Sequence, residues 1–528
     1  MSRSVLLRNG VIYTSADPPA TAMLAAGDRI EWTGTEPAAA PYAGSADEVI
    51  DLGGALVTPA FVDAHIHVLQ TALSEHGVDV AGARSLPDFL ARLSAYAAAH
   101  PGEPVTGQGW DENTWPEGRP PTREEVERAT NGAVVLLSRV DGHSSVVSTA
   151  LLERAPAIAG SDGYEDGLVR RQAQTVARRA LQDGIPDDRR RALHRDVLRH
   201  AAALGIGAVH EMAAPHITSE HDLRLLVDLS RSEPLPEVIP YWGEAGVKRA
   251  RAVGAAGAAG DLTVDGSLGS RSARLTQPYA DDPSTRGQLY LDVDAAAEHV
   301  VACTEAGMQA GFHCIGDEAV RVAVGAISRA AERCGEAAVR ASRHRLEHVE
   351  MITPDLIGEM ARLGVLASVQ PPFDELWGGR DGLYAARLGP DRAAALNPFA
   401  SMLDAGVTLA FGSDSPVAPL GGWETVRAAA YHRTPQQRMS VPDAFAAATR
   451  GGRLAARVDD AGVLAPGMQA TYAVWDVSGR PARAAGGTST GLPDLSPGTD
   501  LPRCVRTVVR GRAVFAADKS WAEVRSSD

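Results

Sequence analysis

The sequence is poor in the residue patterns that mark secreted and membrane proteins. It contains 4 cysteines in 528 residues, and their spacing matches neither a disulfide framework nor a zinc knuckle (Cys303, Cys314, Cys334 and Cys504). It also has no stretch of about 18 apolar residues, the length that a membrane-spanning helix needs. The first four residues lead into a strand-like segment and not into a signal peptide. We therefore expect a cytoplasmic protein that does not insert into a membrane.

Positive charge is scarce as well. The chain has 51 lysines and arginines against 66 aspartates and glutamates, a net charge of −15, and no basic run; its two lysines are Lys248 and Lys519. This balance argues against nucleic acid and anionic membranes as partners and leaves a small-molecule substrate as the expected one. Hydrophobic residues at 45% and charged residues at 22% are ordinary for a soluble enzyme with one large and one smaller domain. The oligomeric state stays open, a homo-oligomer included.

Four short segments carry most of the chemical information. Each is an apolar, strand-like stretch that ends in a metal-binding or proton-handling side chain: PAFVDAHIH (59–67), FHCIGDE (312–318), RLEHVE (345–350) and FGSDSP (411–416). Residues 55–62 are apolar enough for a strand buried on both faces, as in a parallel sheet. Residues i and i+2 of a strand point to the same face, so His65 and His67 can chelate one ion.

The other three segments repeat this arrangement with His313, His348 and Asp414. A single such histidine would ordinarily be a hydrogen-bonded residue of the core, and a single strand-end pair an ordinary polar pair. Here all of them lie at the carboxyl ends of expected strands, which is where catalytic groups collect in a β/α barrel. The pattern therefore predicts a divalent-metal site with the ligands His65, His67, His313, His348 and Asp414.

Further segments run in the same order as in a known family. The chain resembles the amidohydrolase superfamily, and specifically amidohydrolase family 3, through these four segments and through GWDENTWPEGRPPTREEVE (109–127), RVDGHSSVV (139–147), DGSLGSRSARLTQPYADD (265–282) and ASVQPPF (367–373). The resemblance implies a hydrolase of C–N bonds in non-peptide amides, N-formyl or N-acyl compounds, or sometimes a nucleobase-type deaminase. It also implies zinc or a similar divalent ion. A non-catalytic descendant that binds a metabolite is the third alternative.

The resemblance also implies an α/β fold built on a (β/α)8 TIM-type barrel. Residues 57–459 would form this metal-dependent hydrolase barrel, and residues 1–56 and 460–528 would pair into a small composite β-sandwich. Residues 72–190 exceed an ordinary βα connection, and long structureless loops are rare. They should therefore form an insertion over the barrel mouth with its own helices and strands. From about residue 200, strand-like stretches alternate with Ala/Arg-rich helices, as a parallel barrel requires.

One departure from the family bears on the number of ions. Many relatives bridge two ions with a carboxylated lysine four residues before the DGS segment, and Asp261 stands there in this chain. Neither Lys248, in a helix-like segment, nor Lys519, near the C-terminus, is well placed to substitute. We therefore expect one ion, with a pair of ions bridged by Asp261 as the alternative.

The resemblance assigns catalytic roles to Asp414 and His348. With the ion on His65, His67 and His313, Asp414 would touch it weakly, accept the proton of the attacking water and pass it to the leaving nitrogen. His348 would be a ligand of a second ion, or otherwise a donor to the developing oxyanion. Asp317 could orient a ligand histidine, or simply stabilise a helix start.

Five residues are expected to contact substrate: Trp110, Asp111, His143, Arg271 and Asp317. For Trp110 the alternative is packing of the insertion, and for Arg271 an ion pair with an acid. His210 ends a strand-like stretch but is kept out of the ligand set. The remaining histidines, including His194, His200, His216 and His221, are expected on helix surfaces.

Overall fold

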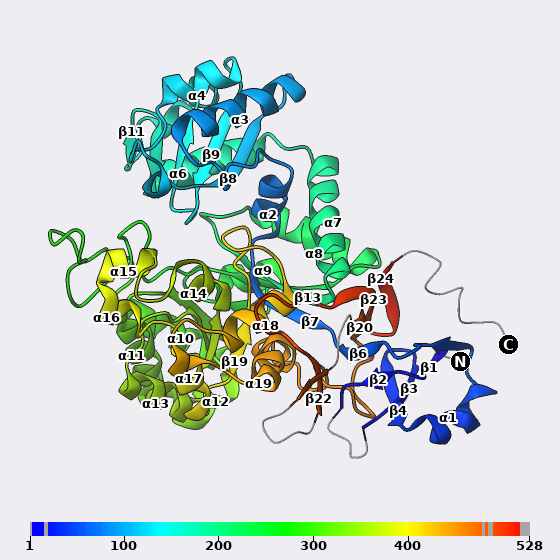
Figure 1. Ribbon diagram of the computed structural model, residues 1–528. Coiled ribbons are helices and arrows are strands. Elements are labelled where there is room, and N and C mark those ends of the chain that lie inside the picture. Colours follow the sequence, from blue (N-terminus) through cyan, green and yellow to red (C-terminus); the bar gives the residue numbers. More distant parts are fainter. Residues whose placement is uncertain (1–2, 15–18, 478–480, 484–488, 518–528) are drawn as a thin grey trace.

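A computed structural model describes residues 3–14, 19–477, 481–483 and 489–517. Lys519 and the end of the predicted sandwich, residues 518–528, lie outside these ranges. In the described part, eight parallel strands form one sheet with the order β19-β18-β17-β16-β15-β14-β13-β7. Its edges meet where Ile66 pairs with Ser415, so the sheet closes as a barrel (Figure 1). The strands are β7 (Phe61–Ile66), β13 (Ile206–Ala213), β14 (Glu237–Trp242), β15 (Gly257–Ala258), β16 (Gln309–Cys314), β17 (Arg345–His348), β18 (Leu366–Val369) and β19 (Leu409–Phe411).

The barrel confirms the predicted fold class, because helices separate its strands along the chain. Strands β7, β13 and β16 are buried along their whole length, as expected for parallel strands covered on both faces. The helices of this part are α2 (Val68–Glu75), α7 (Asp187–Ala203), α8 (Glu220–Ser232), α9 (Lys248–Val253), α10 (Val293–Glu305), α11 (Asp317–Cys334), α12 (Glu336–Ser342), α13 (Pro354–Leu363), α14 (Pro371–Trp377), α15 (Leu383–Leu388), α16 (Pro390–Ala393), α17 (Phe399–Asp404), α18 (Gly422–Ala430), η3 (Pro435–Gln437), α19 (Val441–Ala446), η4 (Ala447–Gly451) and α20 (Gly452–Ala455).

The apolar stretch 55–62 is not one strand, as predicted, but parts of two. β6 (Leu56–Pro59) joins a sheet of the chain termini, and β7 begins at Phe61 and enters the barrel. At the junction the amide of Ala60 donates to the carbonyl of Thr471 (3.3 Å), whereas the amide of Phe61 donates to that of Gly205 (3.0 Å). Both sheets bury this stretch, so its hydropathy is continuous across the boundary.

Strands from both ends of the chain build two sheets beside the barrel. The first has the order β4-β3-β1-β5 and the second β2-β6-β20-β23-β24. Their shared core includes Leu7, Met23, Tyr472 and Val505. The elements are β1 (Ser4–Arg8), β2 (Val11–Ile12), β3 (Ala22–Ala26), β4 (Arg29–Gly34), α1 (Glu36–Ala43), β5 (Glu48–Asp51), β20 (Tyr472–Asp476), β23 (Arg503–Val509) and β24 (Arg512–Ala516), with the separate pair β21 (Pro481–Arg483) and β22 (Ser489–Pro493).

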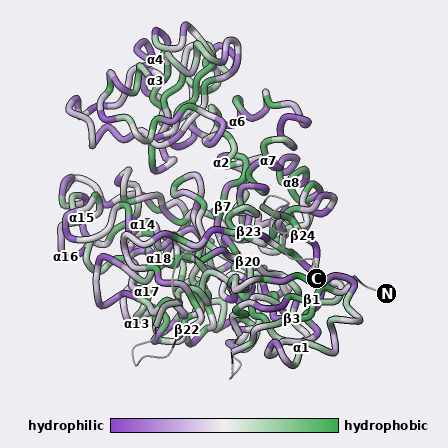
Figure 2. Tube along the Cα trace, turned by 45° about the vertical axis from the view of Figure 1, so that its right-hand side comes forward, coloured by the Kyte–Doolittle hydropathy of each residue, from purple (hydrophilic) through white to green (hydrophobic). Residues whose placement is uncertain are grey.

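The segment between α2 and α7 has its own sheet and its own apolar core. Its sheet has the order β11-β12-β10-β9-β8, and its core includes Phe89, Trp115 and Leu137. Figure 1 places it, in cyan, above the barrel, and Figure 2 shows hydrophobic stretches in its interior and hydrophilic ones outside. Its elements are α3 (Leu86–Ala99), β8 (Val105–Trp110), η1 (Glu112–Thr114), α4 (Arg123–Thr130), β9 (Val135–Arg139), β10 (Ser144–Val147), α5 (Thr149–Arg154), η2 (Pro156–Ile158), β11 (Tyr164–Glu165), β12 (Leu168–Arg170) and α6 (Arg171–Asp183).

None of the helices in the described ranges is long and apolar enough to cross a membrane.

A buried histidine under the barrel gives a test of the packing. The Nδ1 atom of His344 accepts a hydrogen bond from the amide of Ala310 (3.0 Å), and its Nε2 lies 3.0 Å from Oγ1 of Thr304. Oγ1 of Thr304 in turn donates to the carbonyl of Val300 (2.7 Å) and so accepts from Nε2. The ring is therefore neutral, and burial lowers the pKa of His344 to about 3.

The variant His344→Gln should be less sensitive to acid than the wild type. Below pH 6.5 His344 is protonated in the unfolded chain but stays neutral in the folded chain. The free energy of unfolding therefore decreases as pH falls. At pH 5 this costs the wild type about 2 kcal/mol relative to pH 7.5, and glutamine, which keeps an acceptor and a donor, avoids it. Urea unfolding at both pH values measures the difference. Equal losses in wild type and variant would contradict the neutral buried ring.

Candidate metal centre

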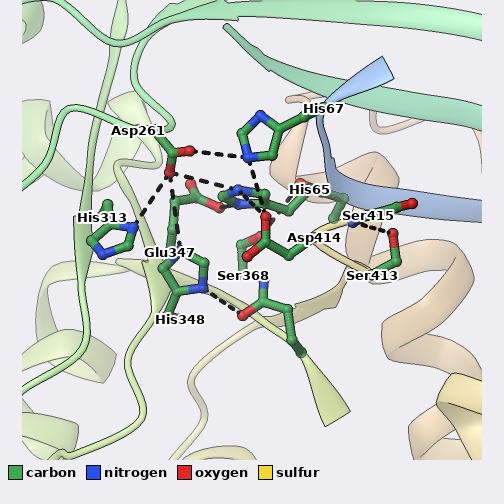
Figure 3. A network of polar contacts seen from close by, with 12 residues as sticks. His65, His67, Asp261, His313, Glu347, His348, Ser368, Ser413, Asp414 and Ser415 are labelled. Atoms are coloured by element: carbon green, nitrogen blue, oxygen red, sulfur yellow. Dashed lines mark hydrogen bonds and ion pairs between the residues drawn. The ribbon is translucent and has the colours of Figure 1, made fainter. Parts of the chain in front are cut away.

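The five predicted ligands converge at the carboxyl ends of the barrel strands (Figure 3). His65 is the next-to-last residue of β7 and His67 follows that strand, His313 lies in β16, His348 ends β17, and Asp414 follows β19. Two groups of ligand atoms, each within 4.8 Å of one another, occur among the described residues: His65 with His67 and Asp414, and His65 with Asp261 and His348. His313 belongs to neither group and reaches them through Asp261.

Asp261 lies at the centre of the four histidines. Its Oδ2 is 3.2 Å from Nε2 of His67, and its Oδ1 is 3.6 Å from Nε2 of His65 and 3.5 Å from Nδ1 of His313. Nε2 of His348 lies 4.0 Å from the same Oδ1. Asp414 faces it across the site, with its Oδ1 3.1 Å from His67 and 3.4 Å from His65. Asp261, which stands where the family that the sequence resembles carries a lysine, is thus part of the cluster.

Three of the histidines are held so that one ring nitrogen faces these carboxylates. Nδ1 of His65 donates to Oε2 of Glu347 (3.0 Å), and Nδ1 of His348 donates to Oε1 of Gln370 (2.8 Å). Nε2 of His313 donates to the carbonyl of Gly266 (3.4 Å). Because each ring uses one N–H on the far side, its other nitrogen is directed at Asp261. Burial would lower the pKa of His65 and of His313, but Asp261 raises both, so the space between these nitrogens and the carboxylate favours a positive charge, which a metal ion can supply in place of ring protons.

The polar atoms inside the cluster fit a divalent ion. Nε2 of His65 and Oδ1 of Asp261 are buried and have no hydrogen-bond partner in the described structure. Burial alone would lower the pKa of His67, but the carboxylates of Asp261 and Asp414 raise it to about 9. The site therefore attracts positive charge, and imidazole and carboxylate are the ligand types that suit zinc and similar ions.

A buried ion pair behind the cluster holds His65, and sequence reasoning missed it. Nε of Arg345 donates to Oε1 of Glu347 (2.6 Å), and both side chains are fully buried. The guanidinium lies 4.5 Å from the ring centre of Tyr241, and its Nη1 is 3.0 Å from Nδ1 of His210. His210 is thus not a ligand but supports Arg345. Positions 345 and 347 share one strand face, and this periodicity within RLEH is the signal that could have revealed the pair.

The backbone at the barrel seam positions the ligands. The amide of Asp414 donates to the carbonyl of His65 (2.8 Å), and Oδ1 of Asp63 accepts from the amides of His65 (3.2 Å) and Ser413 (3.0 Å). A side chain at Gly412 would place its Cβ 2.5 Å from the amide nitrogen of His65, so only glycine fits. Asp414 itself has a φ of 57°, which turns its carboxylate away from the strand direction.

A cavity of about 1130 Å³ lies between the barrel mouth and the insertion. The cluster residues His67, Asp261, His313, His348 and Asp414 line one side of it. Of the expected substrate-contacting residues, three line it as well: Trp110, His143 and Arg271.

The other side chains around the cavity have mixed roles. Trp110 also packs in the core of the insertion, and Arg271 forms an ion pair with Asp281 (2.8 Å). Each residue therefore has the structural role expected as its alternative and also lines the cavity. Asp111 does not line the cavity; its carboxylate accepts from Arg139 (2.9 Å). Asp317 does not line it either, because its Oδ1 accepts from the amide of Thr276 (2.9 Å) at the start of α11.

The expectation that the other histidines lie on helix surfaces is wrong for five of them: His299, His344 and His432 are buried, and the other two are His194 and His216. His194 is completely buried beside Asp222, with 3.2 Å between Nε2 and Oδ1. His216 follows β13 and lines the cavity. His200 and His221 are exposed on α7 and α8 as expected. The sequence around His216 gives no periodic signal, because the residue lies in a loop.

Comparisons with known proteins identify the family of the chain. A family model described as "Amidohydrolase family" matches residues 48–515. Protein LONG AFTER FAR-RED 3 of Arabidopsis thaliana is 26% identical over 519 residues, which cover 89% of this chain and 88% of that protein. Putative amidohydrolase YtcJ of Bacillus subtilis (strain 168) is 26% identical over 458 residues, with 78% and 80% covered. The crystal structure of an uncharacterized metal-dependent hydrolase from Pyrococcus horikoshii has a TM-score of 0.74 at 27% identity, covering 90% of this chain and 98% of that one.

Proposed function

The chain belongs to the amidohydrolase family, and on that premise we propose that it hydrolyses a C–N bond of a small molecule, in an amide, N-formyl or N-acyl group. The family assignment confirms the resemblance inferred from the sequence. The observation that carries the proposal is the set of three histidine nitrogens directed at Asp261, with the far side of each ring held by a hydrogen bond, because such an arrangement serves a bound cation.

We propose one tightly bound ion, held by His65, His67 and Asp414 with Asp261 beside them. The ligand atoms of the first three already lie within 4.8 Å of one another. The two carboxylates together balance the charge of one divalent ion, and a second ion would leave the buried cluster positively charged. The second group of ligand atoms, His65 with Asp261 and His348, offers the alternative of an Asp261-bridged pair.

The residues around this ion have different roles in the proposed hydrolysis. When bound, the ion supplies Lewis acidity, which lowers the pKa of water to about 7 and polarises a carbonyl. Asp414 lines the cavity, where it would accept the proton of the attacking water and return it to the leaving nitrogen. His348 is neutral, since burial lowers its pKa to about 3, and its proton is committed to Gln370. It therefore offers a lone pair to the site, which favours the ligand role over that of an oxyanion donor.

Protein purified without chelators should contain about one zinc-like ion per chain and release amines from amides. Elemental analysis gives the ion content, and amine and ammonia assays across formamides, N-acyl amino acids and nucleobases give the reaction. Two tight ions per chain would replace the single-ion proposal with the bridged pair. Ammonia from a nucleobase would make the protein a deaminase. Inactivity of the metal-loaded protein on the whole panel would contradict hydrolysis of these bonds.

A further inference from the structure

The cavity carries more arginines than any hydrolytic step at the cluster requires. Six line it, and five of them are paired with acids. Arg139 lies within 3.0 Å of three carboxylates, Arg171 pairs with Asp162, Arg170 with Glu165, and Arg271 and Arg387 share Asp281. The exception is Arg178: among the described residues, no carboxylate lies within 4.0 Å of it.

The position of Arg178 is fixed by the turn that carries His143. Its Nη2 donates to the carbonyl of Gly142 (3.2 Å), which also accepts from Nε2 of Gln174 (2.5 Å) on the same helix, α6. This is the one hydrogen bond of the Arg178 guanidinium within the described part of the chain. Its remaining N–H groups are left for a ligand in the cavity.

The electrostatic surroundings of Arg178 favour an anion. Burial lowers the pKa of Arg178 to about 10, and the negative charge of Asp261 offsets part of that effect. Asp261 is thus the acid whose charge raises the pKa of Arg178, although the two do not form an ion pair. Once the charge of Asp261 is balanced inside the ligand cluster, Arg178 is the uncompensated cation of the cavity. A partly buried guanidinium gains most from a planar carboxylate, which can bind two of its N–H groups.

We infer that Arg178 binds a carboxylate of the substrate, so that the substrate is an acidic amide of the N-acyl or N-formyl amino acid class. This inference rests on the proposed C–N bond hydrolysis and specifies its substrate. The insertion supplies Arg178 and the barrel supplies the ligand cluster, so the two parts would hold opposite ends of one molecule. A phosphate dianion fits less well, because the other cavity arginines are already paired.

The test compares N-acetyl and N-formyl amino acids with the N-acetyl and N-formyl derivatives of the matching amines, which lack the carboxylate. For the acids, Arg178→Gln should lower kcat/KM by about 10- to 100-fold, with partial recovery in Arg178→Lys. The uncharged partners should be cleaved equally by both forms. Arg170→Gln is the matched control, because Arg170 lines the same cavity but pairs with Glu165. An equal loss on charged and uncharged substrates would overturn the inference.

A binding measurement separates this inference from the proposed function. Calorimetric titration of the metal-loaded Asp414→Asn protein with the same acids needs no turnover. Binding that is about 10-fold or more weaker when Arg178→Gln is added supports carboxylate recognition, even if the wild type cleaves none of the panel. Unchanged binding, or no binding of any acid, overturns it. Turnover of only the uncharged amides would also overturn it while leaving C–N bond hydrolysis intact.

Discussion

Replacing Asp414 by asparagine should lower kcat by at least about a hundredfold, because an amide cannot accept the proton that the reaction releases. The side chain is buried at the cavity wall, and its Oδ1 lies 3.1 Å from Nε2 of His67. Asparagine has the same shape and tolerates the φ of 57° at this position, so the backbone contact to His65 should remain. Steady-state kinetics on the best amide of the panel, together with the metal content of the variant, measure the effect.

Asp317→Asn is the matched control for this prediction. The same chemical change is made at an aspartate outside the cavity, where the carboxylate accepts from Thr276, so kcat should stay within about twofold of the wild type. Near-normal kcat in Asp414→Asn with the ion still bound would rule out the base role. Loss of the ion together with activity would support the ligand role of Asp414 and leave its base role without support.

The convergence of the proposed ligand histidines could be predicted from the sequence because each lies in or directly after a short, apolar strand with a local signature. Asp261 could not be placed in the same way. Its nearest strand, β15, has two residues, too few for a hydrophobic pattern, and only its position before the DGS segment marked it. Arg178 and His216 come from a helix and a loop that meet the cluster only in three dimensions. Side chains gathered from distant segments leave no mark on local periodicity.

The boundaries of the strands were harder to predict than their existence. The stretch 55–62 is uniformly apolar because two different sheets bury it, so hydropathy cannot show where the chain leaves one sheet for the other. His348 illustrates a second limit. It ends its strand with a φ of 70°, which redirects its side chain from the alternation that the strand would impose. Conformations of this kind depend on the surrounding packing and not on the residue itself.

Truncating Glu347 should cost more stability than the other substitutions considered. Glu347→Ala leaves the guanidinium of Arg345 fully buried without its counter-charge, which typically costs about 3–5 kcal/mol. Burial alone would raise the pKa of Glu347, yet Arg345 and His65 hold it at about 2, so the carboxylate is ionised at any working pH. The same change removes the acceptor of the His65 Nδ1 proton, which should weaken metal binding by about 10- to 100-fold.

The double variant Arg345→Met/Glu347→Leu separates these two effects. Removing both charges should restore part of the lost stability, because no uncompensated ion remains in the core. Metal affinity should stay low, since His65 still lacks the acceptor that fixes its ring. Urea unfolding of the metal-free proteins measures the first quantity, because a bound ion would itself stabilise the fold, and competition with a chromophoric chelator measures the second. If the double variant regained wild-type metal affinity, Glu347 would not be what orients His65, and the ion pair would serve the barrel core alone.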